Sequence, residues 1–314
     1  MAVSTVSRAL SNPDRVSART REHVRAVATR LDYRPNRAAQ ALPSGGSMTM
    51  LGLLVPDITN PHHFGLVRGA EAQARAAGYT LVLGDTRGIP ELEAEHTERL
   101  GSAVDGFVLA SPRGTDQSLR AVRAHRPVVL YNRELDGFRS VVTDAADAGR
   151  QVVEHLAALG HRSIAYLAGP ADAWTDRERH RSLSRHAEAA GMIFRRFGPF
   201  SPTLDGGAAA ADAGLSCDAT ALVAFNDLMA IGALRRMERR GVVVPGAMSV
   251  VGFDDIFGAD FCHPPLTTVS SPVEEAGRRL VDALLTGLGQ PFTERTVLPT
   301  ELLVRESTAP PSIR

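Results

Sequence analysis

The chain has 314 residues, of which 44% are hydrophobic, so it can bury more than one core. Its 35 basic residues are all arginine and equal the 35 acidic residues in number. Cys217 and Cys262 are too few for a disulfide scaffold and lack metal-ligand spacing, which indicates thiols in a reducing compartment. No apolar run reaches the ~20 residues of a membrane span and the first residues do not resemble a signal peptide, so we expect a cytoplasmic protein.

The neutral total hides an uneven distribution of charge. Residues 1–47 contain eight arginines and three acidic residues, a net charge of +5, and the remainder carries −5. A basic head on an acidic body is typical of a protein whose head meets a polyphosphate such as DNA.

The apolar spacing of this head predicts three helices. The first covers residues 4–10. The second is capped by Ser17, because a serine oxygen can accept a free backbone N–H of the first turn. Its inward side chains follow helical spacing: Val24, Val27, Ala28 and Leu31. A short third helix, 37–42, is capped by Asn36 and ended by Pro43, and residues 43–47 form a flexible linker.

Beyond the linker, apolar runs alternate with amphipathic helical patterns. The predicted strands are 50–55, 80–83, 106–110, 127–131, 163–167, 193–197, 221–224 and 248–253. The predicted helices are 64–77, 91–100, 119–124, 145–159, 174–190, 206–213 and 228–239. This alternation predicts parallel sheets with helical crossovers, and its restart after residue 159 predicts two doubly wound α/β lobes with a cleft between them.

The head resembles the DNA-binding head of the LacI/GalR family of bacterial repressors. The residues that carry the resemblance are S-T-V-S-R-A-L-S (4–11), V-S-A-R-T-R-E-H-V (16–24) and L-D-Y-R-P-N-R-A-A-Q-A-L (31–42). The resemblance implies that the first segment is the recognition helix of a helix-turn-helix, lying in the major groove, and that 36–42 is a hinge helix entering the minor groove. The DNA contacts that it implies are Val3, Ser4, Thr5, Ser7, Arg8, Asn36, Arg37, Ala39 and Leu42.

The head also departs from the family pattern. The family's head begins with a further helix that supports the recognition helix, and here that helix would lie before Met1. We therefore expect either a start site assigned too late or a truncated head, which would bind the effector and dimerise without binding DNA, because ~45 residues are near the lower limit for a free-standing core. Pro43 shortens the hinge helix. A solvated, arginine-rich helical extension is the plain alternative.

Five segments of the body resemble the effector domain of the same family, which is similar to periplasmic sugar-binding proteins. They are G-L-L-V-P-D-I-T-N-P (52–61), L-G-H-R-S-I-A-Y-L-A-G-P (159–170), F-N-D-L-M-A-I-G-A-L (225–234), S-V-V-G-F-D-D (249–255) and P-P-L-T-T (264–268). The resemblance implies a two-lobed effector-binding and dimerisation domain over 48–314 after a partial helix-turn-helix head over 1–47. The first lobe is expected over about 48–160 plus 273–298, and the second over about 161–271 plus 299–308.

The expected effector, most often a sugar in this family, binds in the cleft. Ligands of open α/β sheets lie beyond the carboxyl ends of the strands, and sugar hydroxyls pair with Asn, Asp and Arg side chains. The polar candidates are His62, His63, Asn132, Arg179, Asn226 and Asp254, with Ser271 and Val273 on the crossover side. Arg179 and Asp254 are the hydroxyl partners that the family positions favour.

Aromatic side chains near the same strand ends are candidate stacking surfaces for a sugar ring. They are Phe64, Tyr131, Trp174, Phe225 and Phe253. For Trp174 and Phe225, core packing is the favoured explanation. For Asn226, capping of the next helix remains an alternative to ligand contact.

Enzyme, cofactor and metal motifs are absent from the sequence. It contains no GxGxxG, GxxxxGK[ST], HExxH or GxSxG, so we expect no catalysis and no cofactor. His62 and His63 are adjacent and diverge, which argues against a metal site.

The expected protein is a homodimeric, DNA-binding transcriptional regulator, most often a repressor in this family. Two-fold symmetry predicts a pseudo-palindromic operator, and the absence of leucine heptads in 305–314 argues against a coiled-coil tetramer. A stand-alone sugar-binding receptor is the alternative from another class, but it would need a signal peptide where the basic head stands.

Overall fold

The computed structural model describes residues 5–6, 9, 16–30, 49–287 and 295–312. The chain divides into two compact units, Met1–Met48 and Thr49–Arg314. In the first unit, helix α2 spans Ala18–Arg30. Its predicted cap is confirmed, because the Thr20 amide donates to Ser17 Oγ at 3.2 Å. Val24 is buried in this unit, as the helical spacing predicted.

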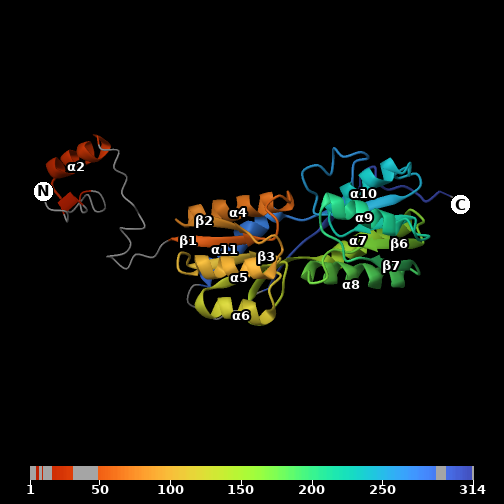
Figure 1. Ribbon diagram of the computed structural model, residues 1–314, viewed down its shortest axis with the longest axis horizontal. Coiled ribbons are helices and arrows are strands. Elements are labelled where there is room, and N and C mark those ends of the chain that lie inside the picture. The colour runs from red at the N-terminus through yellow and green to blue at the C-terminus, as the bar shows by residue number, and fades with distance from the viewer. Residues whose placement is uncertain (1–4, 7–8, 10–15, 31–48, 288–294, 313–314) are drawn as a thin grey trace. The chain divides into compact units, whose positions relative to one another are not determined.

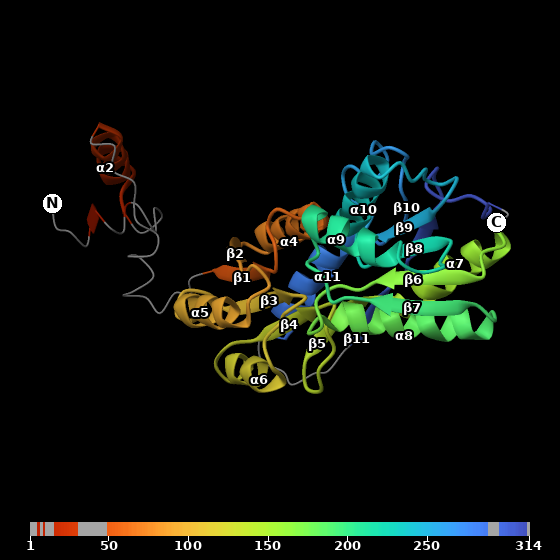
Figure 2. The same cartoon turned by 45° about the vertical axis from the view of Figure 1, so that its right-hand side comes forward.

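The second unit contains two sheets of six strands each (Figures 1 and 2). The sheet of the first lobe has the order β11-β5-β4-β3-β1-β2, and all its pairs are parallel. Its strands are β1 (Met50–Val55), β2 (Thr80–Asp85), β3 (Gly106–Ala110), β4 (Val128–Tyr131), β5 (Arg139–Thr143) and β11 (Arg295–Leu298). Its helices are α4 (His62–Ala76), α5 (Pro90–Gly101), α6 (Asp116–His125) and α11 (Val273–Thr286).

The sheet of the second lobe has the order β12-β10-β9-β8-β6-β7, and only β12 in it is antiparallel to its neighbour. Its strands are β6 (Ser163–Leu167), β7 (Ile193–Phe197), β8 (Ala221–Ala224), β9 (Ser249–Phe253), β10 (Thr267–Ser270) and β12 (Glu301–Leu303). Its helices are α7 (Ala145–Ala158), α8 (Trp174–Ala189), α9 (Leu204–Gly214) and α10 (Asp227–Arg239). The predicted fold class of two doubly wound lobes is confirmed.

Each sheet is buried on both faces because apolar side chains alternate between two cores. In the first lobe, Leu51 and Leu53 pack with α4 and α11, whereas Leu54 packs with α5 and α6. In the second lobe, Ala165 and its alternates face α9 and α10, and Tyr166 faces α7 and α8. Strands covered on both faces are continuously apolar, which is why the sequence pattern found most of them.

The chain passes between the lobes three times. The first-lobe strands β5 and β11 are each followed by an element of the second lobe, and β10 is followed by α11 of the first. Hydrogen bonds tie the crossings together: Gln151 Nε2 donates to the Thr300 carbonyl at 2.9 Å, and the Asp144 amide donates to the Leu298 carbonyl at 2.9 Å. The two lobes are therefore joined by three chain segments.

The expected first-lobe segment, about 48–160, is wrong for one helix. α7 belongs to the second lobe, where Val152 and Leu156 share a core with Tyr166 and Leu183. Gly149 lets α7 approach α8, because a Cβ there would lie 2.3 Å from Ser182 Oγ. The chain therefore leaves the first lobe directly after β5, since the apolar face of α7 packs against α8.

In the first lobe, α4 and α11 pack at backbone distance. A Cβ at Gly69 would lie 1.9 Å from the Glu274 carbonyl oxygen, and one at Gly277 would lie 2.2 Å from the Leu66 carbonyl oxygen. Glycines at both positions therefore determine how close these helices come. No helix in the described part of the chain is long and apolar enough to cross a membrane.

Candidate functional site

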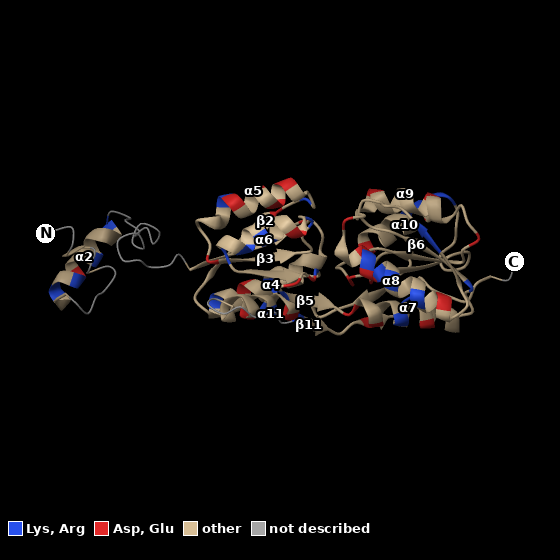
Figure 3. Cartoon of the chain, turned by 90° about the horizontal axis from the view of Figure 1, so that it is seen from below, with Lys and Arg blue, Asp and Glu red and all other residues tan. Residues whose placement is uncertain are grey.

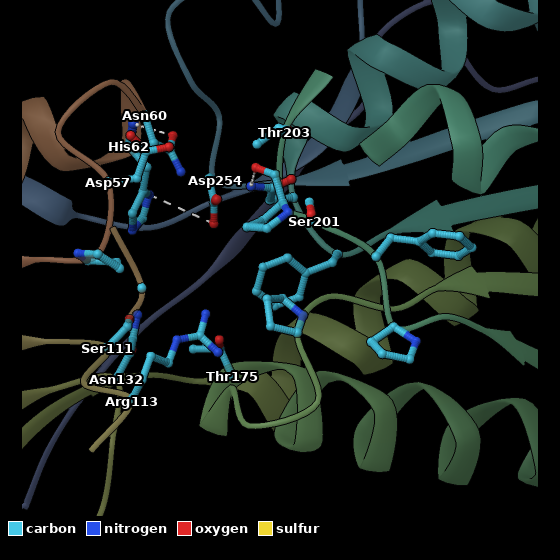
Figure 4. Close-up of a pocket in the computed structure, with 18 of the residues that line it drawn as sticks. Asp57, Asn60, His62, Ser111, Arg113, Asn132, Thr175, Ser201, Thr203 and Asp254 are labelled. Atoms are coloured by element: carbon cyan, nitrogen blue, oxygen red, sulfur yellow. Dashed lines mark hydrogen bonds and ion pairs between the residues drawn. The ribbon is translucent and has the colours of Figure 1, made fainter. Parts of the chain in front are cut away.

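A cavity of about 660 Å³ lies between the two lobes, and we call it the interlobe cavity (Figure 4). Its walls are the loops after β1 to β4 of the first lobe and after β6 to β9 of the second, together with the starts of α4 and α8. The carboxyl ends of parallel strands meet at one edge of a sheet. Where two such edges face each other, the polar loops that follow the strands enclose a space between them. The lining residues are Pro56, Asp57, Asn60, His62, His63, Arg87, Gly88, Ser111, Arg113, Asn132, Pro170, Ala171, Thr175, Arg179, Pro199, Phe200, Ser201, Pro202, Thr203, Phe225, Asn226 and Asp254.

The backbone turns sharply where several strands enter this cavity. Arg87, Ser111, Asn132 and Asp254 line it with φ angles of 52°, 46°, 50° and 108°. Among the described residues other than glycine, only Asp255 also has positive φ, at 48°. Asn and Asp tolerate this region better than other residues, whereas Arg and Ser adopt it at a cost of about 1–3 kcal/mol each. Backbone strain in the described chain is therefore concentrated at the interlobe cavity.

Arg179 and Asp254 form a nearly buried ion pair in the cavity wall. Arg179 Nη2 donates to Asp254 Oδ1 at 2.9 Å, and Nη1 donates to the Phe225 carbonyl. The guanidinium carbon lies 5.1 Å from the Phe225 ring centroid and 4.5 Å from that of Phe253. Asp254 Oδ2 has no hydrogen bond with the described residues, so it can accept one from a ligand. Both predicted hydroxyl partners thus lie side by side in the second lobe, oriented by two aromatic rings.

The first lobe contributes two histidines opposite this pair. His62 Nδ1 lies 3.8 Å from Asp254 Oδ1 across the cavity, and the His62 ring stacks on Tyr131 with centroids 6.3 Å apart. The pKa of His63 is lowered to about 3, chiefly by burial and secondarily by His62. His63 is therefore neutral at physiological pH. No cluster of three or more His, Cys, Asp or Glu suited to a metal occurs in the described ranges.

The two asparagines at strand ends already have structural partners. Asn132 Oδ1 accepts from the Thr143 amide at 2.9 Å, which leaves its Nδ2 without a bond to the described residues. Asn226 Oδ1 accepts from the Met229 amide at 3.0 Å, and Nδ2 donates to the Pro202 carbonyl at 3.2 Å. Asn226 is thus the N-cap of α10, and of the two asparagines only Asn132 has an Nδ2 group with no hydrogen bond to the described residues.

Several candidate residues do not line the interlobe cavity. Phe64 is 54% exposed, because α4 begins at His62 and successive helical side chains diverge by about 100°. Val273 packs in the first-lobe core against α4, and at the start of α8 it is Thr175, not Trp174, that faces the cavity. Tyr131 is fully buried behind His62, and burial raises its pKa. These four residues therefore occupy core, surface or supporting positions outside the wall of the interlobe cavity.

Phe253 and Ser271 line a separate cavity of about 20 Å³ near the crossings, together with Thr300. Phe253 orients Arg179 from there, as described above. Both residues support the hinge side of the site rather than its main volume.

Some lining residues were missed in the sequence although a signal existed. Arg87 and Ser111 follow β2 and β3 in the same way that Asn132 follows β4, and Phe200 to Thr203 follow β7. Applying the strand-end rule to every predicted strand would have found them. Arg113 follows β3 as closely as Phe200 follows β7, whereas Thr175 lies in the first turn of α8 and only the folded loop before it brings it to the cavity.

Most candidate DNA contacts fall outside the described residues: Val3, Ser4, Ser7, Arg8, Asn36, Arg37, Ala39 and Leu42. Thr5 is described, and it is helical and half-buried. Figure 3 shows that basic positions run along α2, where Arg19, Arg21, Arg25 and Arg30 accompany one acidic residue, Glu22.

Comparisons with known proteins show which families and regulators this chain resembles. Residues 2–36 match the family described as bacterial regulatory proteins, lacI family, and residues 153–308 match the periplasmic binding protein-like domain. The transcriptional regulator DegA of Bacillus subtilis is 32% identical, with 99% of this chain and 95% of DegA covered. The transcriptional regulator CelR of Thermobifida fusca is 35% identical, with 96% and 94% covered.

Solved structures give the same result. The lac repressor dimer bound to operator and the anti-inducer ONPF has a TM-score of 0.85 at 30% identity, over 98% of this chain and 95% of that one. The complex of CelR with cellobiose has a TM-score of 0.76 at 31% identity, over 98% and 96%. The resemblance carried by the head and body motifs is thereby confirmed over nearly the whole chain. This chain belongs to the LacI family of bacterial transcriptional regulators.

Proposed function

We propose that this regulator is a homodimeric repressor that binds a pseudo-palindromic operator and is controlled by a sugar bound in the interlobe cavity. The observation that carries the proposal is the Arg179–Asp254 pair, held by Phe225 and Phe253 beside an open cavity with polar groups on both lobes. A sugar offers hydroxyls to such charged partners and an apolar ring face to aromatic carbon. Similar LacI-family structures contain cellobiose or ribose.

Control requires that the sugar favour one angle between the lobes. His62 of the first lobe and Asp254 of the second face each other at 3.8 Å, so a ligand bound to both would stabilise the geometry in which they converge. A ligand shifts a conformational equilibrium only by its difference in affinity for the two states. We propose that this shift changes how the paired hinge helices, 36–42, approach each other, and hence the affinity for DNA.

For the head, we propose that residues 3–8 contact bases and phosphates in the major groove and that Ala39 and Leu42 enter the minor groove. The basic character of the head and its match to the family model support this assignment. We propose no catalytic activity. In support, the described lining residues contain no Ser–His or Thr–His hydrogen bond of the kind that activates a nucleophile, and the relatives are regulators.

The decisive experiment selects DNA with the full-length protein and measures the affinity for the selected duplex by fluorescence anisotropy, with and without neutral and acidic sugars. We expect a two-fold symmetric site, two chains per duplex in sedimentation velocity, and at least one sugar that changes the affinity by about 5- to 150-fold. A sugar that stabilises the protein while no duplex is preferred would instead indicate a regulator that binds its effector but not DNA. A monomer in solution would contradict the dimer.

Asp254→Asn is expected to weaken sugar binding by at least about tenfold. The change keeps size and tolerance of positive φ but removes the charge that pairs with Arg179, whose side chain is only 11% exposed. Asp255→Asn is the matched control, because Asp255 also has positive φ but pairs with Arg305 outside the cavity. Calorimetry should show nearly unchanged affinity for that variant, and equal losses in both variants would contradict a ligand contact at Asp254.

Leu42→Ala is expected to weaken operator binding by at least about tenfold, because a smaller side chain cannot hold an unstacked base step open. Affinity for the sugar should stay unchanged in the same preparation. Loss of both affinities would show that Leu42 is needed for folding instead.

A further inference from the structure

Arg113 is a charged lining residue that the strand-end pattern did not identify. It lies in the loop after β3 of the first lobe, and its side chain is only 7% exposed. Figure 4 shows it pointing across the interlobe cavity towards Thr175 of the second lobe. Its Nη1 donates to Asp172 Oδ1, in the loop after β6, at 3.0 Å. One guanidinium nitrogen therefore has a partner on the opposite lobe.

The loop that carries Arg113 is held by buried charges. The Glu93 carboxylate accepts from the Arg113 amide at 2.9 Å and from the Gly114 amide at 3.1 Å. On the other side, Arg133 Nη1 donates to the carbonyls of Pro112 and Gly114 at 3.1 and 2.9 Å. A Cβ at residue 114 would lie 2.7 Å from Glu93 Oε1, so glycine is needed there. This arrangement fixes the direction of Arg113 before any ligand binds.

The remaining edge of the Arg113 guanidinium is unused. Its Nε is buried and has no hydrogen-bond partner, and Nη2 forms no hydrogen bond with the described residues. Nε–H and one N–H of Nη2 are parallel donors on one planar edge, which matches the two oxygens of a carboxylate or phosphate. A single sugar hydroxyl can satisfy only one of these two donors well. This unpaired edge thus fits an anion better than a neutral ligand.

The charged residues of the cavity wall also favour an anionic ligand. Three described lining residues are cations, Arg87, Arg113 and Arg179, and two are acids, Asp57 and Asp254. Arg179 pairs with Asp254 and Arg113 pairs with Asp172, whereas the Arg87 guanidinium has no partner among the described residues. An anionic ligand would give this lining cation a partner.

We infer that the effector is a sugar bearing an anionic group, a carboxylate or a phosphate, bound by the Nε–Nη2 edge of Arg113 in a cavity that Arg87 also lines. The inference rests on the proposed function, since it assumes that a sugar occupies the interlobe cavity. Arg113 then determines specificity between a neutral sugar and its acidic counterpart.

The test is calorimetric titration of the full-length protein with matched probes: D-glucose, D-galactose and cellobiose against D-glucuronate, D-galacturonate, D-gluconate and D-glucose 6-phosphate. We expect binding among the acidic probes, and the uronates and the phosphate distinguish the two anion types. Arg113→Gln should weaken binding of the acid by about tenfold to a hundredfold, because glutamine cannot form the charged bidentate pair. Arg113→Lys keeps the charge but lacks the planar edge, so its affinity for the acid should lie between those of the unchanged protein and Arg113→Gln.

Asp172→Asn separates anion recognition from a simple tie between the lobes. It breaks the ion pair with Arg113 but leaves the guanidinium in place, so affinity for the acid should be retained or increased. If both Arg113→Gln and Asp172→Asn lose affinity equally for neutral and acidic probes, the inference is overturned. The Arg113–Asp172 ion pair would then serve only to hold the lobes together. If only neutral sugars bind, the inference of an anionic effector is overturned and the proposed function stands. If no probe binds, both the inference and the proposed sugar effector are contradicted.

Discussion

Gly69→Val is expected to destabilise the first lobe by about 3 kcal/mol or more, a large share of the ~5–15 kcal/mol that stabilise a typical domain. A Cβ at this position would lie 1.9 Å from the Glu274 carbonyl oxygen, which belongs to the backbone of α11 and cannot rotate away. The helices α4 and α11 would have to separate, and their shared core with β1 and β3 would lose its packing. Thermal unfolding should occur about 6–12 °C lower than in the unchanged protein.

The control for this prediction is Gly101→Ala at the end of α5. No atom lies within 4 Å of a Cβ built at Gly101, so an added methyl group meets open space. Alanine is also the better helix former, and the melting temperature should stay the same or rise slightly. Similar melting temperatures for Gly69→Val and Gly101→Ala would show that the close approach of α4 and α11 is not needed.

Operator binding by the full-length protein is expected to weaken about 10³- to 10⁵-fold between 50 and 200 mM salt, if a dimer neutralises about 6–10 phosphates. The eight arginines of residues 1–47, against three acids, are the source of that expectation. Binding of cations to phosphates releases counterions, and salt opposes the release. Anisotropy titrations over a salt series measure the slope directly.

Single arginine variants identify the side chains responsible for that slope. Arg8→Gln should reduce the slope by about 0.9 for each phosphate that the variant no longer neutralises. Arg181→Gln is the control, because Arg181 is exposed on α8 and pairs with Glu178 of the same helix. A flat salt response of the unchanged protein would contradict phosphate-led binding.

Most of the strands that the sequence pattern found are buried on both faces, and the largely exposed edge strand β7 is an exception. β1, β3 and β6 are buried throughout, and hydrophobic runs identify such strands without knowledge of their neighbours. β10 was missed because it begins with Thr267 and Thr268, whose hydroxyls look like surface chemistry. In the fold both are fully buried, and Thr268 Oγ1 donates to Asp227 Oδ1 at 2.6 Å. β5, β11 and β12 also lack a long apolar run and were missed for the same reason.

For the candidate site, too, the sequence patterns identified some residues and left others to be decided by the fold. The strand-end rule and the family positions brought forward Arg179, Asp254 and Asn132, and all three line the interlobe cavity. The strand-end rule and the family positions could not tell whether Asn226 contacts a ligand or caps a helix. The answer depends on its hydrogen bonds with the Met229 amide and the Pro202 carbonyl. Phe64 lies on the exposed side of α4 because neighbouring side chains of a helix diverge by about 100°, and which of them faces the cavity depends on the fold.

The sequence by itself determined the α/β class, the two-lobed organisation, the basic head and the family, because apolar periodicity, charge and contiguous motifs are local properties. Tertiary structure alone decided which polar side chains still have free donors or acceptors. Arg113 has an open edge only because Glu93, some twenty residues earlier, and Asp172, on the other lobe, position its loop and occupy one nitrogen. Hydrogen-bond satisfaction is set by groups brought together from distant parts of the chain, and no local pattern contains it.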